Sequence, residues 1–350
     1  MHREADMRDR PAVLVTGGAG YIGSHCCRAL HANGFHAVVY DNFSTGHRSF
    51  VTGSLVTGDL RDRAKLAHAL TQYGVVAVMH FAASSLVGES VANPQKYYMN
   101  NLAGTLSLLD AMREAGCQRL VFSSTGAVYG NADSKALPES WRCEPINPYG
   151  ASKWMIERVL QDYRRAYGFA SFALRYFNAS GADAAGGIGE LRDPETHLIP
   201  RAMMALQGHI SEFAVFGDDY DTPDGTAVRD YIHVTDLAAA HVRALKLLLQ
   251  GHGGGVCNLG TGQGFSVREI LAAIASETGR TVPHVVKPRR PGDPAWLVAD
   301  PAAARETLQF RPVHSDLATI VRTAWAWHRK AHPMKADAAV QVDADLSPAA

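Results

Sequence analysis

Short apolar runs alternate with amphipathic stretches over the first 180 residues of the chain. The apolar runs are rich in valine and end in small or polar residues, as buried parallel strands do; they lie at 11–17, 36–42, 54–60, 75–83, 119–124 and 171–178. The stretches at 62–74 and 104–116 have the spacing of amphipathic helices. This alternation predicts an α/β fold with a doubly wound, parallel, Rossmann-type sheet.

After residue 178 the elements become shorter, and the segment 181–194 is rich in glycine and aspartate. We expect a first domain at 11–178 and a smaller C-terminal, substrate-binding α/β domain at 179–334, whose elements can interleave with the first. The ends of the chain, 1–10 and 335–350, lack periodicity and are expected to be disordered tails. The elements expected in the second domain are helices near 198–208, 234–250 and 266–279 and strands at 212–217 and 255–260.

Charge and cysteine content narrow the classes of partner. The 34 Lys and Arg residues equal the 34 Asp and Glu residues, so we expect no nucleic-acid or membrane-surface partner. No run of 18 apolar residues and no apolar leader is present in the sequence, which favours a cytoplasmic protein. The five cysteines lack the spacing of metal ligands, so reduced thiols and no metal are expected.

A glycine motif follows the first predicted strand directly. Gly17, Gly20 and Gly23 stand in TGGAGYIG, before the next amphipathic stretch. Such glycines let the chain turn sharply and let a pyrophosphate approach the backbone, while the free amides of the following helix face the phosphates. The motif alone is also compatible with a plain strand-to-helix turn.

Two acidic residues at strand ends favour a cofactor. Asp41 closes the second strand, where a carboxylate accepts hydrogen bonds from an adenosine ribose. It would also repel a 2′-phosphate, which favours NAD over NADP. Asp59, at the end of the third strand, is placed to meet the adenine. Together with the glycine turn, these residues predict that the first domain binds NAD.

Tyr149 and Lys153 are four residues apart and would share one face of a helix. A nearby ammonium lowers the pKa of a phenol, which turns tyrosine into a base near neutral pH. Thr125, at the end of the fifth strand, is expected to bridge a substrate oxygen and Tyr149, with Ser123 and Ser124 beside it. The sequence thus predicts Tyr149, Lys153 and Thr125 as the catalytic group.

The chain resembles the UDP-glucose 4-epimerases from about residue 11 to 333. The resemblance rests on TGGAGYIGSH, HFAA with VGES, SSTGAVYG, NPYGASK, LRYFN, VRDYIHV, CNLG and RRPGD. It implies that NAD is held tightly and recycled. It implies that Tyr149 takes the proton of the sugar 4-hydroxyl as hydride leaves carbon 4, and that the 4-keto sugar rotates before hydride returns. It also implies a homodimer through helices near 93–116 and 149–167.

The resemblance also carries site residues onto positions of this sequence. Besides the glycines, Tyr149 and Lys153, the implied cofactor contacts are Tyr21, Ile22, Asp41, Asn42, Asp59, Leu60, Phe81, Ala82, Ala83, Asn100, Ser123 and Tyr176. Besides Ser124, Thr125 and Tyr149, the implied UDP-sugar contacts are Asn178, His197, Leu198, Ala214, Val215, Phe216, Arg229, Arg290, Asp293 and Leu297. Two arginines suit a diphosphate because the guanidinium forms forked, charge-assisted bonds.

Three positions depart from the family pattern. Ser85 replaces a lysine that is frequent after HFA, and His197 replaces an asparagine found in some members. Leu297 corresponds to a position that often carries a bulky tyrosine over the sugar, or adjacent Trp296 does if the alignment slips by one residue. A leucine there implies a roomier pocket, which leaves glucose/galactose, their N-acetylated forms and xylose/arabinose open as sugars.

Two other functions share parts of this pattern. Sugar-nucleotide dehydratases usually need an acid after the strand-end threonine, whereas Gly126 and Ala127 follow Thr125 here. A non-catalytic NAD-binding regulator would not need the reactive tyrosine, which this chain keeps with its lysine. The sequence therefore favours a UDP-sugar 4-epimerase over both.

Overall fold

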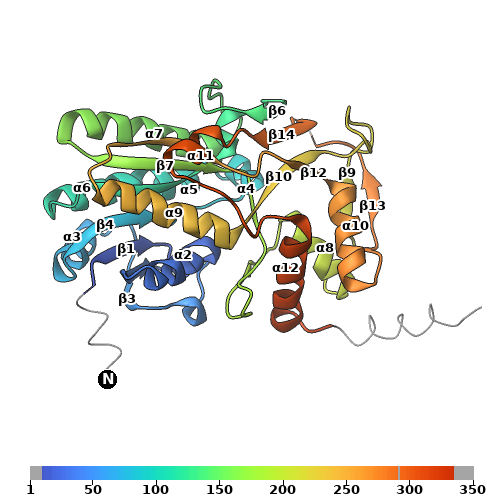
Figure 1. The fold of residues 1–350 in the computed structure, drawn as a ribbon, viewed down its shortest axis with the longest axis horizontal. Helices are drawn as coiled ribbons and strands as arrows, with labels where there is room; N and C mark the ends of the chain where they lie inside the picture. The colour runs from blue at the N-terminus through green and yellow to red at the C-terminus, as the bar shows by residue number, and fades with distance from the viewer. Residues whose placement is uncertain (1–9, 291, 335–350) are drawn as a thin grey trace, which may run out of the picture.

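A computed structural model describes residues 10–290 and 292–334 of the chain. Of the predicted tails, only Arg10 falls within these residues; 1–9 and 335–350 lie outside them. A large sheet with its helices forms one part of the molecule, and α8, α10, α12, β9 and β13 gather in a smaller part beside it (Figure 1).

The large sheet has seven parallel strands in the order β11-β7-β5-β4-β1-β2-β3. These strands are β1 (Ala12–Thr16), β2 (His36–Asp41), β3 (Ser54–Thr57), β4 (Val75–His80), β5 (Arg119–Thr125), β7 (Ala170–Tyr176) and β11 (Gly254–Leu259). All five residues of β1 are buried, because helices cover both faces of the sheet. The predicted α/β fold with a doubly wound, Rossmann-type sheet is confirmed.

Alternate residues of β1 belong to two hydrophobic cores. Val13 and Val15 join a cluster that includes apolar residues of α2 and α9, and Leu14 joins a second cluster with residues of α3, α6 and α7. This division follows from the two-residue period of a strand. The five helices are α2 (Tyr21–Ala32), α3 (Arg63–Gln72), α6 (Gly104–Glu114), α7 (Pro148–Tyr167) and α9 (Val234–Leu249).

The smaller part is built on β10, which pairs with β12, β14 and β8, while β14 also pairs with β6. These strands are β6 (Ser134–Leu137), β8 (Asn178–Ser180), β10 (Val228–His233), β12 (Gly264–Ser266) and β14 (Trp296–Ala299). A separate pair joins β9 (Ala214–Phe216) to β13 (Val285–Lys287). The helices of the smaller part are α8 (Leu198–Leu206), α10 (Val267–Thr278) and α12 (Leu317–Ala331), whereas α11 (Ala302–Thr307) packs against β11 of the large sheet.

A single boundary at residue 178 does not divide these two parts. From the second half of the chain, α9 packs on α2 and β11 adds to the large sheet beside β7. From the first half, β6 crosses to the smaller sheet. The expectation that the domains interleave allowed for this exchange, and the apolar residues of α9 and β11 explain it, since they complete the first core.

Short helices connect β4 to α6. They are α4 (Val87–Ala92), α5 (Pro94–Tyr97) and a π-helical turn η2 (Tyr98–Ala103). Single 3-10 turns occupy η1 (Arg48–Phe50) and η3 (Gly126–Tyr129). No helix in the described part of the chain is long and apolar enough to span a membrane.

Candidate active site

The glycine turn between β1 and α2 lies against the loop after β4. A Cβ atom on Gly17, whose φ is +71°, would stand 2.6 Å from the backbone nitrogen of Ala82. A Cβ atom on Gly23 would stand 2.2 Å from the carbonyl oxygen of Gly17. Gly20 precedes the first residue of α2 and, having no side chain, leaves the amides of the first turn uncapped. The turn is therefore a tight backbone cradle at a helix N-terminus, which suits an anion.

The end of β2 is tied to this turn by Asp41. Its Oδ2 accepts a hydrogen bond from the amide of Ala19 at 3.0 Å, and its Oδ1 accepts one from the amide of Phe43 at 2.8 Å. Asn42, which follows β2, donates to the carboxylate of Asp59, which follows β3, at 3.2 Å. Arg61 bonds the same carboxylate and holds the pKa of Asp59 at about 2. Two acceptor-rich strand ends thus lie beside the cradle, with buried Leu60 next to them.

The loop after β4 carries the predicted contacts Phe81, Ala82 and Ala83 and is anchored by two asparagines of η2. Asn101 accepts a bond from the amide of Ser84 at 2.8 Å and donates to Ser152 of α7 at 3.0 Å. Asn100 donates to the hydroxyl of Ser84 at 3.3 Å. Single π-turns are frequent at functional sites. Here the π-turn fixes the loop relative to the helix that carries the reactive pair.

Helix α7 places Tyr149 and Lys153 beside the end of β5. The helix starts where Asn147 caps the amide of Gly150 at 2.9 Å, so Tyr149 lies in its first turn. Lys153 donates to the carbonyl oxygen of Ser123 at 2.8 Å. The phenol of Tyr149 is hydrogen-bonded to the side chain of Thr125. The three residues that the sequence predicts as catalytic are thus brought together.

Burial changes the acidity of both members of the pair. It raises the pKa of Tyr149, against the hydrogen bond from Thr125 and the positive charge of Arg192. It lowers the pKa of Lys153 to about 7, against the carboxylate of Glu157. The pKa of Lys153 therefore approaches neutrality, whereas that of Tyr149 moves away from it, so Tyr149 needs a nearby positive charge to act as a base.

The two serines of β5 point in opposite directions. The hydroxyl of Ser123 bonds the phenol of Tyr176. The hydroxyl of Ser124, which is 1% exposed, instead donates to Glu157 Oε1 at 2.5 Å in the interior. The expected contact of Ser124 with the substrate is therefore not what the structure shows. Alternation along the strand turns Ser124 toward the core, away from the side on which Ser123 meets Tyr176.

The segment 181–197 forms a strap that is bonded to the part of the molecule built on the large sheet. The phenol of Tyr21 donates to the carbonyl oxygen of Gly181 at 2.6 Å. Arg192 donates to the hydroxyl of Ser85 at 3.1 Å and pairs with Glu190 at 3.0 Å. No role was predicted for Arg192 from the sequence, although it is a lone cation in an otherwise acidic loop. Its charge lies close enough to Tyr149 to favour the phenolate.

Three residues of the strap, Glu190, Glu195 and His197, come close enough to resemble a metal site. However, Glu190 Oε1 already binds His197 Nδ1 at 2.6 Å and Arg192 Nε at 3.0 Å. The carboxylate raises the pKa of His197, and the guanidinium is a fixed positive charge. The cluster is therefore an ion-paired anchor for His197, and we assign no metal to it.

The predicted UDP-sugar contacts surround β10 and β9. Arg229 binds Asp293 at 2.5 Å and donates to the carbonyl oxygens of Val228 and Pro294 at 2.7 and 2.8 Å. Arg290 lies over the ring of Phe216, 4.0 Å from its centroid. The rest of the set lies on neighbouring elements: Asn178 at the start of β8, Leu198 at the start of α8, and Ala214 and Val215 in β9.

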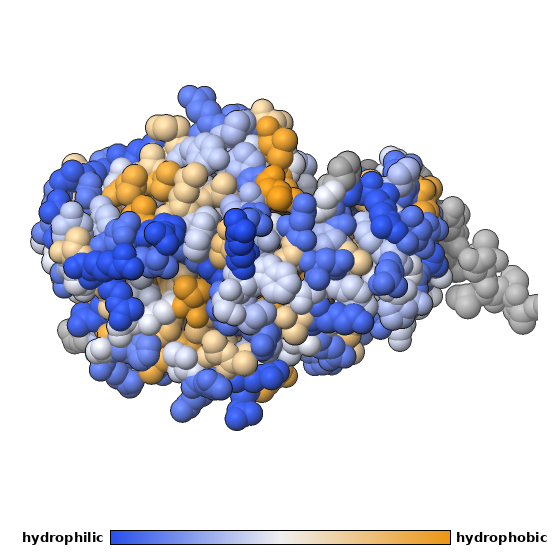
Figure 2. Space-filling view, turned by 90° about the horizontal axis from the view of Figure 1, so that it is seen from above, coloured by the Kyte–Doolittle hydropathy of each residue, from blue (hydrophilic) through white to orange (hydrophobic). Residues whose placement is uncertain are grey.

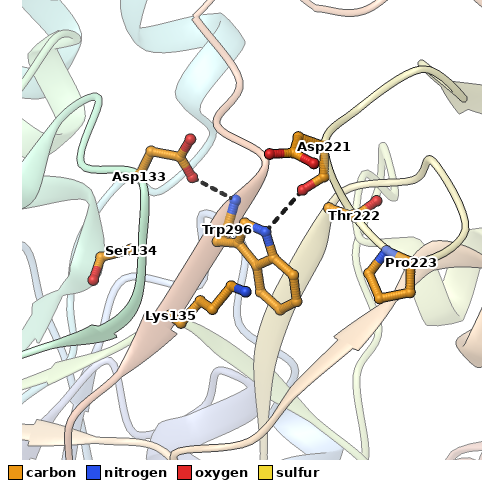
Figure 3. A pocket seen from close by; sticks show the side chains of 7 residues that line it. All are labelled: Asp133, Ser134, Lys135, Asp221, Thr222, Pro223 and Trp296. Atoms are coloured by element: carbon orange, nitrogen blue, oxygen red, sulfur yellow. Dashed lines mark hydrogen bonds between the residues drawn. The ribbon is translucent and has the colours of Figure 1, made fainter.

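Trp296 and Leu297 occupy opposite sides of β14. Trp296 lines a surface cavity of about 500 Å³, where its amide donates to Asp133 at 2.8 Å and its indole donates to the carbonyl oxygen of Asp221 at 3.1 Å (Figure 3). Leu297 packs against a buried cluster that includes Tyr129. The side chain of Trp296 therefore lies at the surface, and Leu297 is the residue of this pair that faces the interior, where it packs near η3 and β6.

Comparison with known proteins agrees with this geometry. Residues 13–260 match the family described as the NAD dependent epimerase/dehydratase family. The chain is 51% identical over 321 residues to a UDP-glucose 4-epimerase of Rhizobium leguminosarum bv. trifolii, covering 91% of this chain and 98% of that protein.

Solved structures are similar over the same length. The UDP-glucose 4-epimerase of Brucella ovis, in complex with NAD, is 55% identical with a TM-score of 0.88 and covers 90% of this chain and 97% of its own. That of Stenotrophomonas maltophila, with NAD and formylated UDP-arabinopyranose, is 42% identical with a TM-score of 0.89 and covers 92% and 98%. The chain thus belongs to the NAD dependent epimerase/dehydratase family, and these relatives within that family are UDP-glucose 4-epimerases.

Proposed function

We propose that this chain is a UDP-glucose 4-epimerase that works with tightly bound NAD. The observation that carries the proposal is the group at the end of β5, where Tyr149 is bonded to Thr125 and Lys153 is buried close by. Identity of about half over nine-tenths of the chain to curated UDP-glucose 4-epimerases supports it. The alternatives named from the sequence share the fold but lack this combined support.

The residues around the glycine turn fit NAD. The cradle at Gly17 and Gly23 has no room for a side chain, and α2 begins there with an uncapped turn. Asp41 retains acceptor capacity for a ribose beyond the two amides that fix it. Its negative charge would disfavour the 2′-phosphate of NADP. NAD, when bound, takes a hydride from the sugar and returns it.

The residues of this chain then supply the proton chemistry. Tyr149 takes the proton of the sugar 4-hydroxyl and later gives it back. Thr125 holds the sugar oxygen and the phenol in one hydrogen-bonded line. The ammonium of Lys153 stabilises the phenolate, which matters because burial raises the pKa of Tyr149. If the 4-keto sugar rotates in the site before it is reduced, the product is the 4-epimer and no net redox change occurs.

The substrate side must hold the nucleotide firmly while the sugar turns. Arg290 stacks on Phe216 and keeps its guanidinium edge for a diphosphate. Arg229 is already paired with Asp293, so the charge that it offers to phosphate is partly neutralised. We therefore expect Arg290 to contribute more than Arg229 to UDP affinity.

We infer that the identity of the sugar depends on the size of residue 297. Leucine at this position is smaller than a tyrosine, which favours acceptance of N-acetylated hexoses besides glucose and galactose. A pentose is the other alternative, and the relative from Stenotrophomonas maltophila was solved with formylated UDP-arabinopyranose. A dehydratase is disfavoured because Gly126 and Ala127, which follow Thr125, offer no acid.

The direct experiment incubates the purified protein with UDP-galactose and separates the nucleotide sugars by chromatography. We expect conversion to UDP-glucose without added cofactor. The Tyr149→Phe variant should bind UDP-galactose normally and lose most turnover. Absence of conversion with UDP-galactose, UDP-N-acetylgalactosamine and UDP-xylose would exclude the proposed function.

We also propose a homodimer formed through α4, η2, α6 and α7. Each of these elements exposes an apolar residue that a second copy of the chain would cover: Val91, Met99, Leu106 and Met155. Figure 2 looks onto the side of the molecule that carries α7, and apolar side chains gather over that half, whereas the end with β9 and β13 is mainly hydrophilic.

A cytoplasmic setting fits the five free cysteines.

A further inference from the structure

A buried ion pair lies behind the reactive residues and takes no direct part in the proposed chemistry. Glu157 of α7 and Arg175 of β7 form two parallel bonds, Nε to Oε1 at 2.9 Å and Nη2 to Oε2 at 2.5 Å. Their side chains are only 1% and 3% exposed. Arg175 lies in the motif LRYFN, and Glu157 follows the motif NPYGASK by four residues, yet no role was predicted for either from the sequence.

Stability alone is a weak reason for such a pair. Removing two charges from water costs several kcal/mol per ion, and buried pairs can often be replaced by apolar residues without loss. The pair therefore calls for a role that apolar side chains could not serve.

The position of Glu157 supplies that role. It lies one helical turn after Lys153, so the two side chains share a face of α7. Lys153 is 2% exposed, and Glu157 is the carboxylate that favours its charged form against burial. The same carboxylate accepts the hydroxyl of Ser124, one residue before Thr125 on β5. Glu157 thus lies one helical turn from the lysine and is bonded to the strand that carries Thr125.

Arg175 fixes this carboxylate from the other side. In the sheet it pairs with Ser124, as Tyr176 pairs with Thr125. Its guanidinium also donates to the phenol of Tyr129 at 2.9 Å, which donates to Asn258 of β11 at 2.7 Å. The carboxylate is therefore held by β5, β7 and β11 together and has little freedom to turn away from Lys153.

We propose that Glu157, clamped by Arg175, is a positioning residue that keeps the ammonium of Lys153 charged and aligned beside Tyr149. This inference rests on the proposed function, since it concerns the pH range in which Lys153 supports the phenolate. At the spacing of one helical turn, loss of the carboxylate should lower the pH at which Lys153 loses its proton by about one unit or more.

Other titratable groups near Lys153 do not explain such a change. His80 of β4 is buried, and its pKa is lowered to about 3, so it stays neutral in the relevant range. Tyr149 of α7 and Tyr176 of β7 are phenols, and burial raises the pKa of both. Arg192 of the strap carries a fixed positive charge, as does Arg175. Among the described residues, Glu157 is thus the anionic group that raises the pKa of Lys153 against burial.

The test measures kcat for UDP-galactose as a function of pH in the full-length protein and in Glu157→Gln. The alkaline limb, where Lys153 loses its proton, should move to lower pH by about one unit, so that kcat above that limb falls about tenfold. KM and the NAD content after purification should stay within about twofold of the wild type. Asp162→Asn, which removes an exposed charge from the same helix, should leave the profile unchanged.

A second variant separates charge from folding. Glu157→Gln combined with Arg175→Met removes both charges, and because no unpaired guanidinium remains it should be better tolerated than the single variant. Its alkaline limb should move in the same direction but by less, because the opposing positive charge of Arg175 is removed as well. A wild-type pH profile in either folded variant would overturn the proposal. Inactive wild-type protein would instead refute the proposed function, so the two failures are distinguishable.

Discussion

Substitution of Gly17 by alanine tests whether the turn is the close-packed cradle that the cofactor requires. At φ +71° an L residue costs about 1–2 kcal/mol in left-handed strain. The new Cβ would also stand 2.6 Å from the backbone nitrogen of Ala82, and relief of such an overlap costs about 1–3 kcal/mol. The sum, about 2–5 kcal/mol, is a large part of the 5–15 kcal/mol that holds a typical domain folded.

Gly34 provides a matched control. Its φ is +81°, but a Cβ there would meet no atom within 4 Å. Gly34→Ala should therefore lose only the strain, about 1–2 kcal/mol. Urea unfolding of the two variants, with NAD content measured in parallel, separates the contributions: Gly17→Ala should unfold at clearly lower urea and purify with less NAD. Equal midpoints and equal NAD content would refute the argument that close approach, beyond backbone strain, defines this turn.

Four further predictions follow from other contacts. Asp41→Asn should weaken NAD binding and reduce the preference over NADP, measured by cofactor titration of the stripped protein; an unchanged preference would remove the proposed role. Leu297→Tyr should reduce turnover of UDP-N-acetylglucosamine more than that of UDP-glucose, and equal losses would speak against Leu297 as the sugar-limiting residue. Met155→Glu should halve the mass found by light scattering, whereas a monomeric wild type would contradict the proposed dimer. Stability should fall as pH drops from 6.5 toward 4, by up to about 1.4 kcal/mol per pH unit for each histidine that is buried in its neutral form, and equal urea midpoints at pH 7.5 and 5 would contradict this. Burial lowers the pKa of these histidines to about 3 or 4: His25, His80, His233, His241 and His328.

The sign of this last effect follows from the reference state. A histidine in the unfolded chain has a pKa near 6.5, so between about pH 6.5 and 4 the unfolded chain binds protons that the folded protein excludes. The neutral, buried form contributes its full stability above that window. His80 illustrates the reason, because burial and the positive charge of Lys153 both disfavour protonation of its ring.

Local pattern was enough to predict most of the large sheet and the proximity of Tyr149 to Lys153. Strands such as β1, β2 and β4 are buried, largely apolar runs, and Tyr149 and Lys153 are related by helical spacing. The exchange of β6 and β11 between the two parts could not be predicted in this way, because it depends on which edge strand completes each sheet. The interior direction of Ser124 was missed for a similar reason, since its partner Glu157 is 33 residues away in the chain.

The strap shows a different limit of sequence reasoning. Arg192 stands among acidic residues in a loop without periodicity, so nothing local indicates that it reaches Ser85, 107 residues earlier. His197 was identified through the family resemblance, but its buried partner Glu190 was not. Contacts of this kind depend on how a loop folds back over a sheet edge.

The central claim is that hydride leaves carbon 4 of the sugar and returns to the same carbon, while Tyr149 handles only the proton. UDP-galactose labelled with deuterium at carbon 4, incubated with the enzyme in ordinary water and analysed by mass spectrometry and NMR, tests this claim directly. We expect the UDP-glucose formed to keep the deuterium at carbon 4. Product that has exchanged the label for solvent hydrogen would contradict it.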